Sequence, residues 1–488
     1  MKILFTTSEA VPYSKSGGLG DVCGALPKFL KKRGHDIRLV LPRYWSLDRG
    51  KLGLKTVLPS MGVRMGTGTD WCSVLESRAG DVPVYFIDHE QYFGRAGYYD
   101  DGRREYDDNA ARFGFFSRAC LQLCRDLGFQ PDIMHAHDWP TALVPAYLKL
   151  DTSGDPFFSQ TASVLSIHNI AYQGVFPSKF LDYLGIARSQ FVEPRFESFG
   201  DLHFMKGGIF FADALTTVSP GYASEILSEP GANGLSGYLR RREADLVGIL
   251  NGADYDHWNP ETDPLIPARF SPRNLSGKAR CKKALQKEFG LEQDAKIPVV
   301  GIISRFVQQK GLHLLASVIQ SIVRDMRVQF VIVGSGEKGL EDFFGGLPRD
   351  FSGRVGAWIG YNDAKAHLIE AGADFFLMPS LYEPCGLNQI YSMKYGTLPI
   401  VRATGGLRDT VRSYDERMGT GTGFVFEAAE PGAIYDTVGW AVSTFYDRPR
   451  HFQAMRREAM KCDFSWEQAI PSYESIYEKA RQRRSLWT

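Results

Sequence analysis

The segment EAVPYSKSGGLGDV at residues 9–22 contains residues that could bind or activate a ligand. In it, Lys15 stands before Gly17 and Gly18. The loop follows a short apolar segment and leads into a helix-like segment whose first turn holds Asp21. Glycines let a backbone approach a ligand closely, and N–H groups at the start of a helix favour an anion. The loop therefore predicts a phosphate site with Lys15 as a mobile positive charge. A glycine-rich turn with a solvated lysine is the alternative.

Two well-known phosphate loops do not fit the chain. The dinucleotide fingerprint would need its third glycine at the position of Cys23. A P-loop would need a lysine after Gly339, where Leu340 stands. Any phosphate site must therefore be of another kind.

A second loop, SRFVQQKG at residues 304–311, carries Arg305 and Lys310. Two cations on one loop could compensate a pyrophosphate, the arginine through bidentate hydrogen bonds and the lysine as a point charge. Two solvated surface charges are the alternative.

A third stretch, residues 378–411, places Glu383 on a proline-containing turn after an apolar segment, just before CGL opens a helix. The segment TGGL repeats this arrangement further along the chain. A carboxylate can accept hydrogen bonds from sugar hydroxyls, and N–H groups near Gly386 and Gly406 could face an anion. This stretch therefore predicts contacts to a sugar and to an anion.

Short apolar segments alternate with helix-length amphipathic segments, which predicts parallel sheets covered by helices on both faces. The pattern starts again at residues 297–304, after a stretch rich in Pro, Asp and Asn at residues 251–274. We therefore expect an α/β protein with two doubly wound, Rossmann-like domains, residues 1–252 and 253–465, and a helix at 466–488 that packs back on the first domain. Ligands of such sheets bind outside the carboxyl ends of the strands, so loops from both domains are expected to line one cleft.

The bulk composition excludes several classes of protein. Lys and Arg number 57 against 56 Asp and Glu, without the basic excess that a nucleic-acid or membrane-surface partner usually needs. The apolar runs are far shorter than the roughly 20 residues of a membrane span, and the N-terminus lacks the apolar core of a signal peptide. The 7 scattered cysteines suit a reduced compartment. We expect a protein of the bacterial cytoplasm with no nucleic-acid or membrane partner.

Six segments together resemble the family of bacterial glycogen synthases and plant starch synthases, which are retaining glycosyltransferases of the GT-B type. They occur in that family's order along essentially the whole chain, as KSGGLGDV, HAHDW, SIHNIAYQG, GILNGAD, SRFVQQKG and YEPCGLNQIYSMKYGTLPIVRATGGLRDTV. The resemblance implies transfer of glucose from ADP-glucose to the non-reducing end of glycogen or another α-1,4-glucan, with release of ADP. A related transferase that uses UDP-glucose and a non-catalytic glucan-binding protein are the alternatives.

The resemblance also implies roles for individual residues. Lys15, Arg305 and Lys310 would face the diphosphate of the donor, Glu383 would hold the glucosyl hydroxyls, and Tyr361 would stack on the adenine. Further contacts to the phosphates, the sugar or the acceptor are implied for Gly17, Gly18, Asp21, Tyr99, Asp138, His168, Asn169, Asn251, Cys385, Gly386, Leu387, Thr404, Gly405, Gly406 and Leu407.

The chain offers no obvious carboxylate nucleophile of the kind that a retaining glycosidase uses. The resemblance implies front-face departure instead, in which the leaving phosphate helps to deprotonate the acceptor and the backbone carbonyl of His168 stabilises the positive sugar. A covalent route stays open. Tyr391 stands where broader relatives of the fold have a second glutamate, which favours the glycogen and starch synthase branch, and Ser16 stands where threonine is commoner.

Two stretches could suggest a metal, but we expect no metal and no other cofactor. His135 and His137 are two positions apart at the end of a strand, and we expect their rings to point to opposite faces, which argues against joint ligation. Asp254 and Asp256 match the Asp-x-Asp metal motif of other glycosyltransferases, but turn chemistry is the favoured interpretation there.

Overall fold

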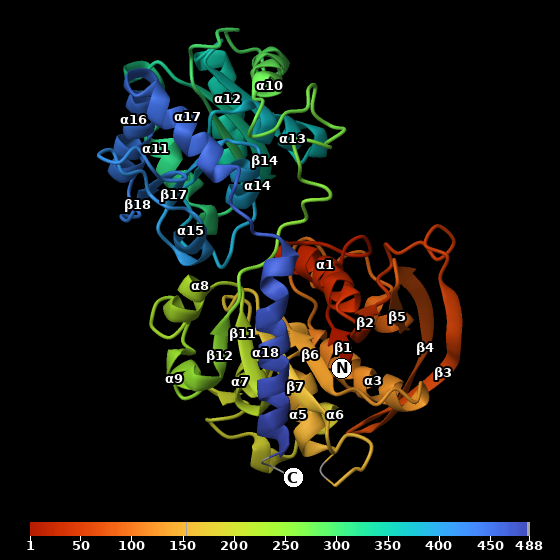
Figure 1. The fold of residues 1–488 in the computed structure, drawn as a ribbon. Coiled ribbons are helices and arrows are strands. Elements are labelled where there is room, and N and C mark those ends of the chain that lie inside the picture. Colours follow the sequence, from red (N-terminus) through yellow and green to blue (C-terminus); the bar gives the residue numbers. More distant parts are fainter. Residues whose placement is uncertain (153, 486–488) are drawn as a thin grey trace. The chain divides into compact units, whose positions relative to one another are not determined.

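The computed structural model describes residues 1–152 and 154–485 and divides into two compact units. The first unit holds Met1–Val218, Ala223–Gly252 and the described residues from Trp466 onward. The second holds Ser219–Tyr222 and Ala253–Ser465. Each unit is built around its own sheet, which is mainly parallel in the first unit and fully parallel in the second (Figure 1).

The first unit contains a nine-stranded sheet whose core is parallel. Its strands run in the order β12 (Leu246–Gly248), β11 (Ala214–Thr217), β7 (Ala162–Ile167), β6 (Ile133–His137), β1 (Lys2–Thr6), β2 (Asp36–Pro42), β5 (Val82–Asp88), β4 (Gly68–Ala79) and β3 (Lys55–Met65). The pairs of β4 with β5 and with β3 are antiparallel, and the other pairs are parallel. The chain passes from β1 to β2, continues to the edge strand β3 and comes back through β4 to β5, then crosses to β6 on the other side of β1 and winds in the opposite direction. The point between β1 and β6 is therefore the switch point where such sheets bind ligands.

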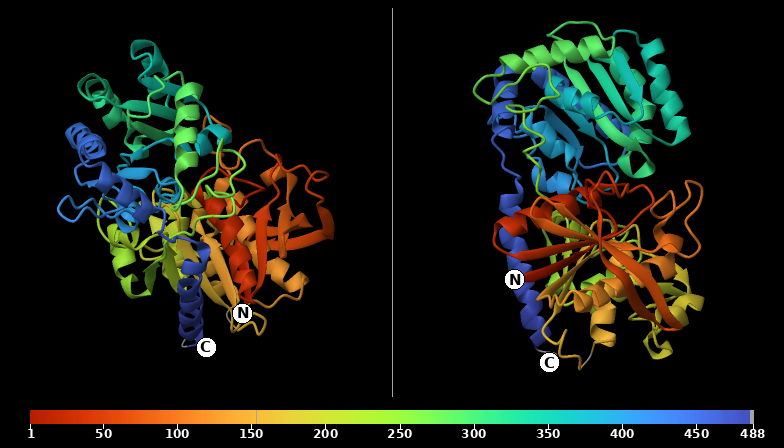
Figure 2. Two further views of the ribbon diagram at one scale, coloured as in Figure 1. Left: turned by 45° about the horizontal axis from the view of Figure 1, so that its top comes forward. Right: turned by 90° about the vertical axis from the view of Figure 1, so that its right-hand side faces the viewer.

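One face of this sheet is covered by helices α1 (Gly18–Lys32) and α18 (Trp466–Ser485). Alternate residues of β1, Ile3 and Phe5, point to this face because side chains in a strand alternate between the two sides. The indole of Trp466 lies 2.4 Å from where a Cβ on Gly252 would stand, so the chain needs glycine there. Both views of Figure 2 show α18 running along this unit.

The remaining elements of residues 1–252 are helical or form a small separate sheet. The longer helices are α3 (Asn109–Asp126), α5 (Leu143–Leu150) and α7 (Phe204–Phe211), and α5 contacts β6 and β7. The short helices are α2 (Glu90–Phe93), α4 (Asp138–Thr141), α6 (Leu181–Leu184), α8 (Pro220–Glu225) and α9 (Ser236–Arg240). The small antiparallel sheet has the order β8 (Val175–Pro177), β10 (Asp201–His203) and β9 (Glu197–Ser198).

The second unit contains a six-stranded sheet that is parallel throughout. Its order is β15 (Val355–Ile359), β14 (Gln329–Gly336), β13 (Val299–Phe306), β16 (Phe375–Met378), β17 (Leu398–Arg402) and β18 (Phe424–Phe426). Numbered along the chain this is 3-2-1-4-5-6, the order of a Rossmann fold, and the switch point lies between β13 and β16. Its helices are α10 (Ser276–Glu288), α11 (Leu312–Asp325), α12 (Lys338–Asp350), α13 (Asp363–Gly372), α14 (Asn388–Lys394), α15 (Gly405–Thr410), α16 (Pro431–Asp447) and α17 (Pro449–Ala459).

Two apolar clusters cover the two faces of this second sheet. Val300 and Ile302 of β13 pack with α11, α12, α16 and α17, whereas Val299 packs with α10, α13 and α15 on the other face. This alternation explains why the strands read as continuous apolar runs in the sequence. The predicted α/β class with two doubly wound units is confirmed.

All seven cysteines are free thiols, and Cys120 and Cys124 are buried within α3. Within residues 1–152 and 154–485, every helix is too short or too polar to cross a membrane.

Candidate active site

In both units the predicted polar side chains follow the two strands that flank the switch point. In the first unit, the loop after β1 carries Lys15, and Asp138 directly follows β6. In the second unit, Arg305 lies near the end of β13, Lys310 follows it, and Glu383 comes after β16. Open parallel sheets bind ligands outside the carboxyl ends of their strands at this point. Each unit therefore places its predicted residues where its topology predicts a ligand.

The loop after β1 presents Lys15 on the surface of the first unit. Its Nζ lies 2.8 Å from Oδ1 of Asp21, and the two side chains are 49% and 33% exposed. A Cβ added to Gly17 or Gly18 would meet nothing within 4 Å, so these glycines leave open space beside the loop. At Gly24, by contrast, a Cβ would lie 2.4 Å from a Val11 methyl, because the loop packs directly on α1.

A buried carboxylate, Glu9, holds this loop from inside. Its Oε1 accepts hydrogen bonds from the Ser16 hydroxyl at 2.6 Å and from the Tyr99 hydroxyl at 2.7 Å, and its Oε2 accepts one from the Ser16 N–H. Ser8 Oγ lies 2.7 Å from the same Tyr99 hydroxyl. Burial, with the nearby Glu9 charge, raises the pKa of Tyr99 well above its usual value. Tyr99 therefore stays neutral near pH 7, and its hydroxyl is held against the loop that carries Lys15.

Asp138 and His168 form the second polar group at the switch point of the first unit. Oδ1 of Asp138 accepts hydrogen bonds from the backbone N–H of His168 at 2.7 Å and of Asn169 at 3.4 Å. Burial raises the pKa of Asp138 to about 7, although these two bonds act in the opposite direction. Burial also lowers the pKa of His168 to about 3, so its imidazole is neutral near pH 7. The site thus holds a carboxyl group that titrates near neutral pH beside an uncharged histidine.

The prediction that His135 and His137 point to opposite faces is wrong. Their ring centroids lie 4.1 Å apart, because residues two positions apart in a strand share a face. Nδ1 of His137 lies 3.0 Å from Nε2 of His168, so His137 supports that predicted site residue from behind. Burial lowers the pKa of His137 well below its usual value.

Asn251 follows β12 and is buried. Among the described residues its Oδ1 has no hydrogen-bond partner. An unmade bond of this kind costs about 1–3 kcal/mol, so a buried amide oxygen normally finds a ligand or water. This favours the predicted binding role of Asn251.

The second unit brings Lys310 and Glu383 into direct contact. Lys310 Nζ lies 2.6 Å from Oε2 of Glu383, which also accepts a hydrogen bond from the Ser380 hydroxyl at 3.1 Å. The Glu383 side chain is only 7% exposed. Arg305, near the end of β13, is exposed. The loop after β13 can turn this closely because Gly311 has φ 67° and its missing Cβ would lie 2.0 Å from the Pro379 carbonyl oxygen.

Two glycines at the start of α15, Gly405 and Gly406, are packed against the backbone of the turn that holds Glu383. A Cβ on Gly405 would lie 2.0 Å from the Glu383 carbonyl oxygen, and one on Gly406 would lie 2.1 Å from the Cys385 carbonyl oxygen. The N–H of Gly406 donates to the Glu383 carbonyl at 3.1 Å, and the N–H of Leu407 donates to the Thr404 carbonyl at 3.0 Å. In this structure both groups therefore stabilise the loop, and their contact with an anion stays a prediction.

A comparable arrangement holds the loop between Glu383 and α14. Gly386 has φ 74°, and a Cβ there would lie 2.5 Å from Oε1 of Gln389. The Gln389 side chain donates to the carbonyls of Cys385 and Gly386 at 3.1 and 3.0 Å. Cys385, Gly386 and Leu387 thus form a fixed backbone turn beside Glu383.

Tyr361 follows β15 and presents its ring to solvent. The residue is 74% exposed, and its hydroxyl donates to Oδ1 of Asp363 at 2.9 Å. An aromatic ring that is exposed and held at its hydroxyl offers a flat face on which a planar base could stack.

Comparisons with known proteins agree with this arrangement along the whole chain. A family model for the starch synthase catalytic domain matches residues 2–241, and one for group 1 glycosyl transferases matches residues 285–444. The chain is 47% identical over 487 residues to glycogen synthase 1 of Geobacter metallireducens, covering 99% of this chain and 97% of the relative. The chain belongs to the glycogen synthase and starch synthase family.

Two further relatives support this membership. Glycogen synthase of Treponema denticola is 44% identical over 492 residues, with 99% of both chains covered. The solved catalytic domain of starch synthase IV from Arabidopsis thaliana, bound to ADP and acarbose, matches with a TM-score of 0.89 and 32% identity over 99% of both chains. The predicted family, GT-B fold and enzyme class are confirmed, and this family member is a glucosyltransferase of the glycogen synthase kind.

Three residues that contact the predicted site residues were not predicted from the sequence. Glu9 lies in the loop that carries Lys15. Its position just after the carboxyl end of β1 could have marked it as a candidate site residue. His137 and Ser380 also contact predicted site residues, but nothing in their sequence spacing identifies them as candidates.

The prediction of a turn at Asp254 is confirmed. The Asp254 carboxylate accepts a hydrogen bond from the backbone N–H of Asp256 at 3.1 Å.

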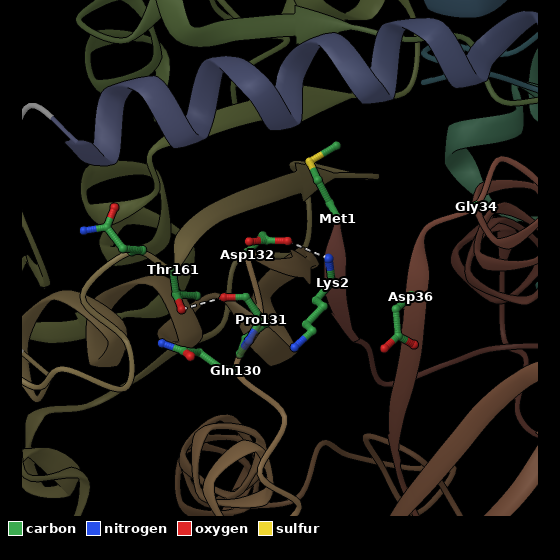
Figure 3. Close-up of a pocket in the computed structure, with 9 residues that line it drawn as sticks. Met1, Lys2, Gly34, Asp36, Gln130, Pro131, Asp132 and Thr161 are labelled. Atoms are coloured by element: carbon green, nitrogen blue, oxygen red, sulfur yellow. Dashed lines mark hydrogen bonds between the residues drawn. The ribbon is translucent and has the colours of Figure 1, made fainter.

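A hollow of about 510 Å³ lies at the opposite edge of the first sheet, at the amino ends of β1, β2, β6 and β7 (Figure 3). Within it, the Lys2 N–H donates to Asp132 at 2.7 Å and the Thr161 hydroxyl donates to the Pro131 carbonyl at 2.7 Å. The described residues that line it include none of the predicted site residues. Because ligands bind at the carboxyl ends of such strands, we do not assign the active site to this hollow.

The raised pKa of Asp138 leads to a testable pH dependence of stability. Its pKa lies near 7 in the fold against an ordinary 3.8, so the fold favours the protonated form. The contribution is largest at low pH and is lost as pH rises towards 7, at about 1.4 kcal/mol per pH unit. Asp138→Asn cannot ionise and can keep the left-handed backbone at φ 54°.

We therefore expect Asp138→Asn to gain stability relative to the parent by about 2–3 kcal/mol between about pH 5 and pH 7. Thermal unfolding of both proteins across this range measures the difference. The exposed Asp107→Asn should show no such trend. A difference between Asp138→Asn and the parent that does not vary with pH would contradict the assignment.

Proposed function

We propose that this family member transfers glucose from ADP-glucose to the non-reducing end of an α-1,4-glucan, with retention of configuration and release of ADP. The observation that supports this proposal most directly is the contact of Lys310 with Glu383 at the switch point of the second unit. Arg305 lies nearby in the chain, near the end of strand β13, which leads into the loop of Lys310. The starch synthase IV structure that resembles this chain contains ADP, which supports an adenine nucleotide as the leaving group.

The second unit supplies the groups for the nucleotide and its sugar. Arg305 and Lys310 bind the diphosphate, and the Glu383 carboxylate accepts hydrogen bonds from glucosyl hydroxyls. Tyr361 stacks on the adenine. The turn at Cys385, Gly386 and Leu387 borders the sugar, and Thr404, Gly405, Gly406 and Leu407 border the phosphates.

The first unit supplies groups for a sugar and for the acceptor. Lys15, beside Gly17 and Gly18, faces the phosphates and the sugar, and Asp21 positions the lysine through their ion pair. Asp138, His168, Asn169, Asn251 and Tyr99 contact the sugar or the acceptor.

Breaking the bond between the anomeric carbon and the phosphate places negative charge on the diphosphate and positive charge on the sugar. Fixed cations that face the diphosphate stabilise this charge as it develops. In the front-face route that we propose, the leaving phosphate takes the proton of the acceptor hydroxyl, and the His168 backbone carbonyl faces the positive sugar. The neutral imidazole of His168 adds no opposing charge.

The reaction as proposed needs no metal or other cofactor, because Lys15, Arg305 and Lys310 provide the positive charge. Elongation of a maltooligosaccharide by ADP-glucose, with and without EDTA, tests this. We expect products longer by single glucose units, equal rates in both samples, and complete digestion of the new ends by an exo-acting α-1,4-glucanase. Loss of elongation in EDTA, restored by magnesium, would contradict the metal-free route, and absence of elongation in both samples would contradict the function.

A further inference from the structure

A cluster of metal-ligating side chains lies in the second unit, apart from Lys310 and Glu383. His257, Asp363 and His367 place one ligand atom each within 4.8 Å of one another. The two histidine Nε2 atoms are 3.2 Å apart, and Oδ1 of Asp363 lies 3.9 Å from Nε2 of His367. His257 comes from the chain that follows β12, and the other two come from α13.

The separation of the two Nε2 atoms is that of two ligands on one ion. Zinc binds imidazole nitrogen at about 2.0–2.1 Å, and a tetrahedral arrangement then places two nitrogens about 3.3 Å apart. Oδ1 of Asp363 must approach Nε2 of His367 by roughly 0.6 Å to reach this separation, and the Asp363 side chain is 44% exposed and can move. Oδ1 of Asp363 also accepts a hydrogen bond from the Tyr361 hydroxyl. Oδ2 of Asp363 can accept this bond when Oδ1 binds the ion.

A buried carboxylate fixes the state of His367. Oδ2 of Asp263 lies 2.7 Å from Nδ1 of His367 and accepts the Tyr395 hydroxyl at 2.6 Å. Asp263 and His367 side chains are both fully buried. The carboxylate holds the proton on Nδ1, which leaves the Nε2 lone pair directed at His257. This is the carboxylate–histidine arrangement that commonly stands behind a metal ligand.

The ring of His367 is also held in its plane. The indole of Trp258 stacks on the His367 ring, with ring centroids 3.8 Å apart and an angle of 9° between the ring planes. On Tyr391 it stacks with centroids 4.5 Å apart and the same angle. His257, next to Trp258 in the chain, is exposed. The cluster therefore has a rigid inner ligand, a solvent-facing outer ligand and an open side for water.

We propose that His257, Asp363 and His367 bind one zinc-class divalent cation, with water as the fourth ligand. The ion contributes no group to glucosyl transfer, so the proposal does not depend on the proposed function. Two histidines and one carboxylate with an open position suit Zn²⁺ and, as a spectroscopic substitute, Co²⁺.

Titration of the untagged, chelator-treated full chain with zinc chloride against a chromogenic chelator tests the proposal. We expect one zinc ion per chain, and affinity at least about tenfold lower in His257→Ala and in Asp363→Asn. His313→Ala, which removes an exposed histidine of α11 outside the cluster, should bind as the parent does. Glucosyl transfer by His257→Ala should equal that of the parent.

A second group in the described residues, Cys23, His137 and His168 of the first unit, is the rival for the same zinc. Cobalt distinguishes the two, because a thiolate ligand adds a charge-transfer band in the near ultraviolet that a histidine–carboxylate site lacks. We expect the cobalt spectrum without this band and unchanged zinc binding in Cys23→Ala. Parent-like zinc affinity in His257→Ala and Asp363→Asn, or loss of zinc in Cys23→Ala, would overturn the proposal.

Discussion

Replacing Lys310 with alanine is expected to lower kcat by about 10²- to 10³-fold, the usual cost of removing one fixed group that stabilises transition-state charge. In the proposed reaction its ammonium group faces the departing diphosphate, so its effect grows as the bond breaks. The donor KM should change less, because Arg305 remains to bind the ground state. Steady-state kinetics with ADP-glucose measure both quantities.

The same substitution should also reduce stability, which separates two roles of Lys310. It leaves the Glu383 carboxylate, only 7% exposed, without its cation, and breaking a buried pair costs about 3 kcal/mol. Adding Glu383→Gln removes the uncompensated charge, so the double variant should recover much of the lost melting temperature while kcat stays low.

A matched control lies on α12 of the same unit. Lys338 forms an exposed ion pair with Asp342 at 2.7 Å, so Lys338→Ala should retain parental kcat and stability. If folded Lys310→Ala kept kcat within about threefold of the parent, Lys310 would have no place in the charge stabilisation that we propose.

Replacing Lys15 with alanine is expected to lower kcat by about 10²-fold with almost no loss of stability. Its ion pair with Asp21 is exposed on both sides, and pairs of this kind contribute at most about 1 kcal/mol. The contrast with Lys310→Ala is informative, because a solvated lysine with no role in the site would affect neither kcat nor stability. Kinetics and thermal unfolding of one preparation measure both effects.

Lys31 provides the control for Lys15. It lies in the last turn of α1 and pairs with Asp36 at 3.9 Å on the surface. Lys31→Ala should behave as the parent in both measurements. Equal kcat for Lys15→Ala and Lys31→Ala would remove Lys15 from the site.

Local sequence patterns predicted the elements of the second sheet well. The apolar run at residues 297–304, where the pattern starts again, becomes β13, and helix α11 and strand β14 follow it in the predicted alternation. These strands are buried on both faces, so their sequences are apolar throughout and easily recognised. The loops that follow them carry Arg305, Lys310 and Glu383 because the switch point lies at the carboxyl ends of β13 and β16.

Contacts between distant residues were beyond the reach of these patterns. Glu9 meets Tyr99 across 90 positions, and no periodicity links the two. The buried carboxylate of Asp263 and the ring of His367 are 104 positions apart. The error at His135 and His137 had a different origin, because the sequence alone contained the correct answer. Side chains in a strand alternate with a period of two, so residues two positions apart share a face.

Residues 251–274 show another limit of prediction from composition. Their Pro, Asp and Asn content indicates an irregular stretch, and the structure indeed gives them few regular elements. Yet Ile266 and Phe270 are buried against Cys281 and Tyr395 of the second unit. Apolar residues without a helical or strand period give no sign of what they pack against.

The most direct test of the proposed function is incorporation of labelled glucose into glycogen from ADP-glucose and, in parallel, from UDP-glucose, without added metal. We predict rapid incorporation from ADP-glucose, with a kcat/KM well above that for UDP-glucose. A higher kcat/KM for UDP-glucose would contradict the proposed nucleotide while leaving the chemistry of the cations intact. No incorporation from either donor would contradict the proposed transfer itself.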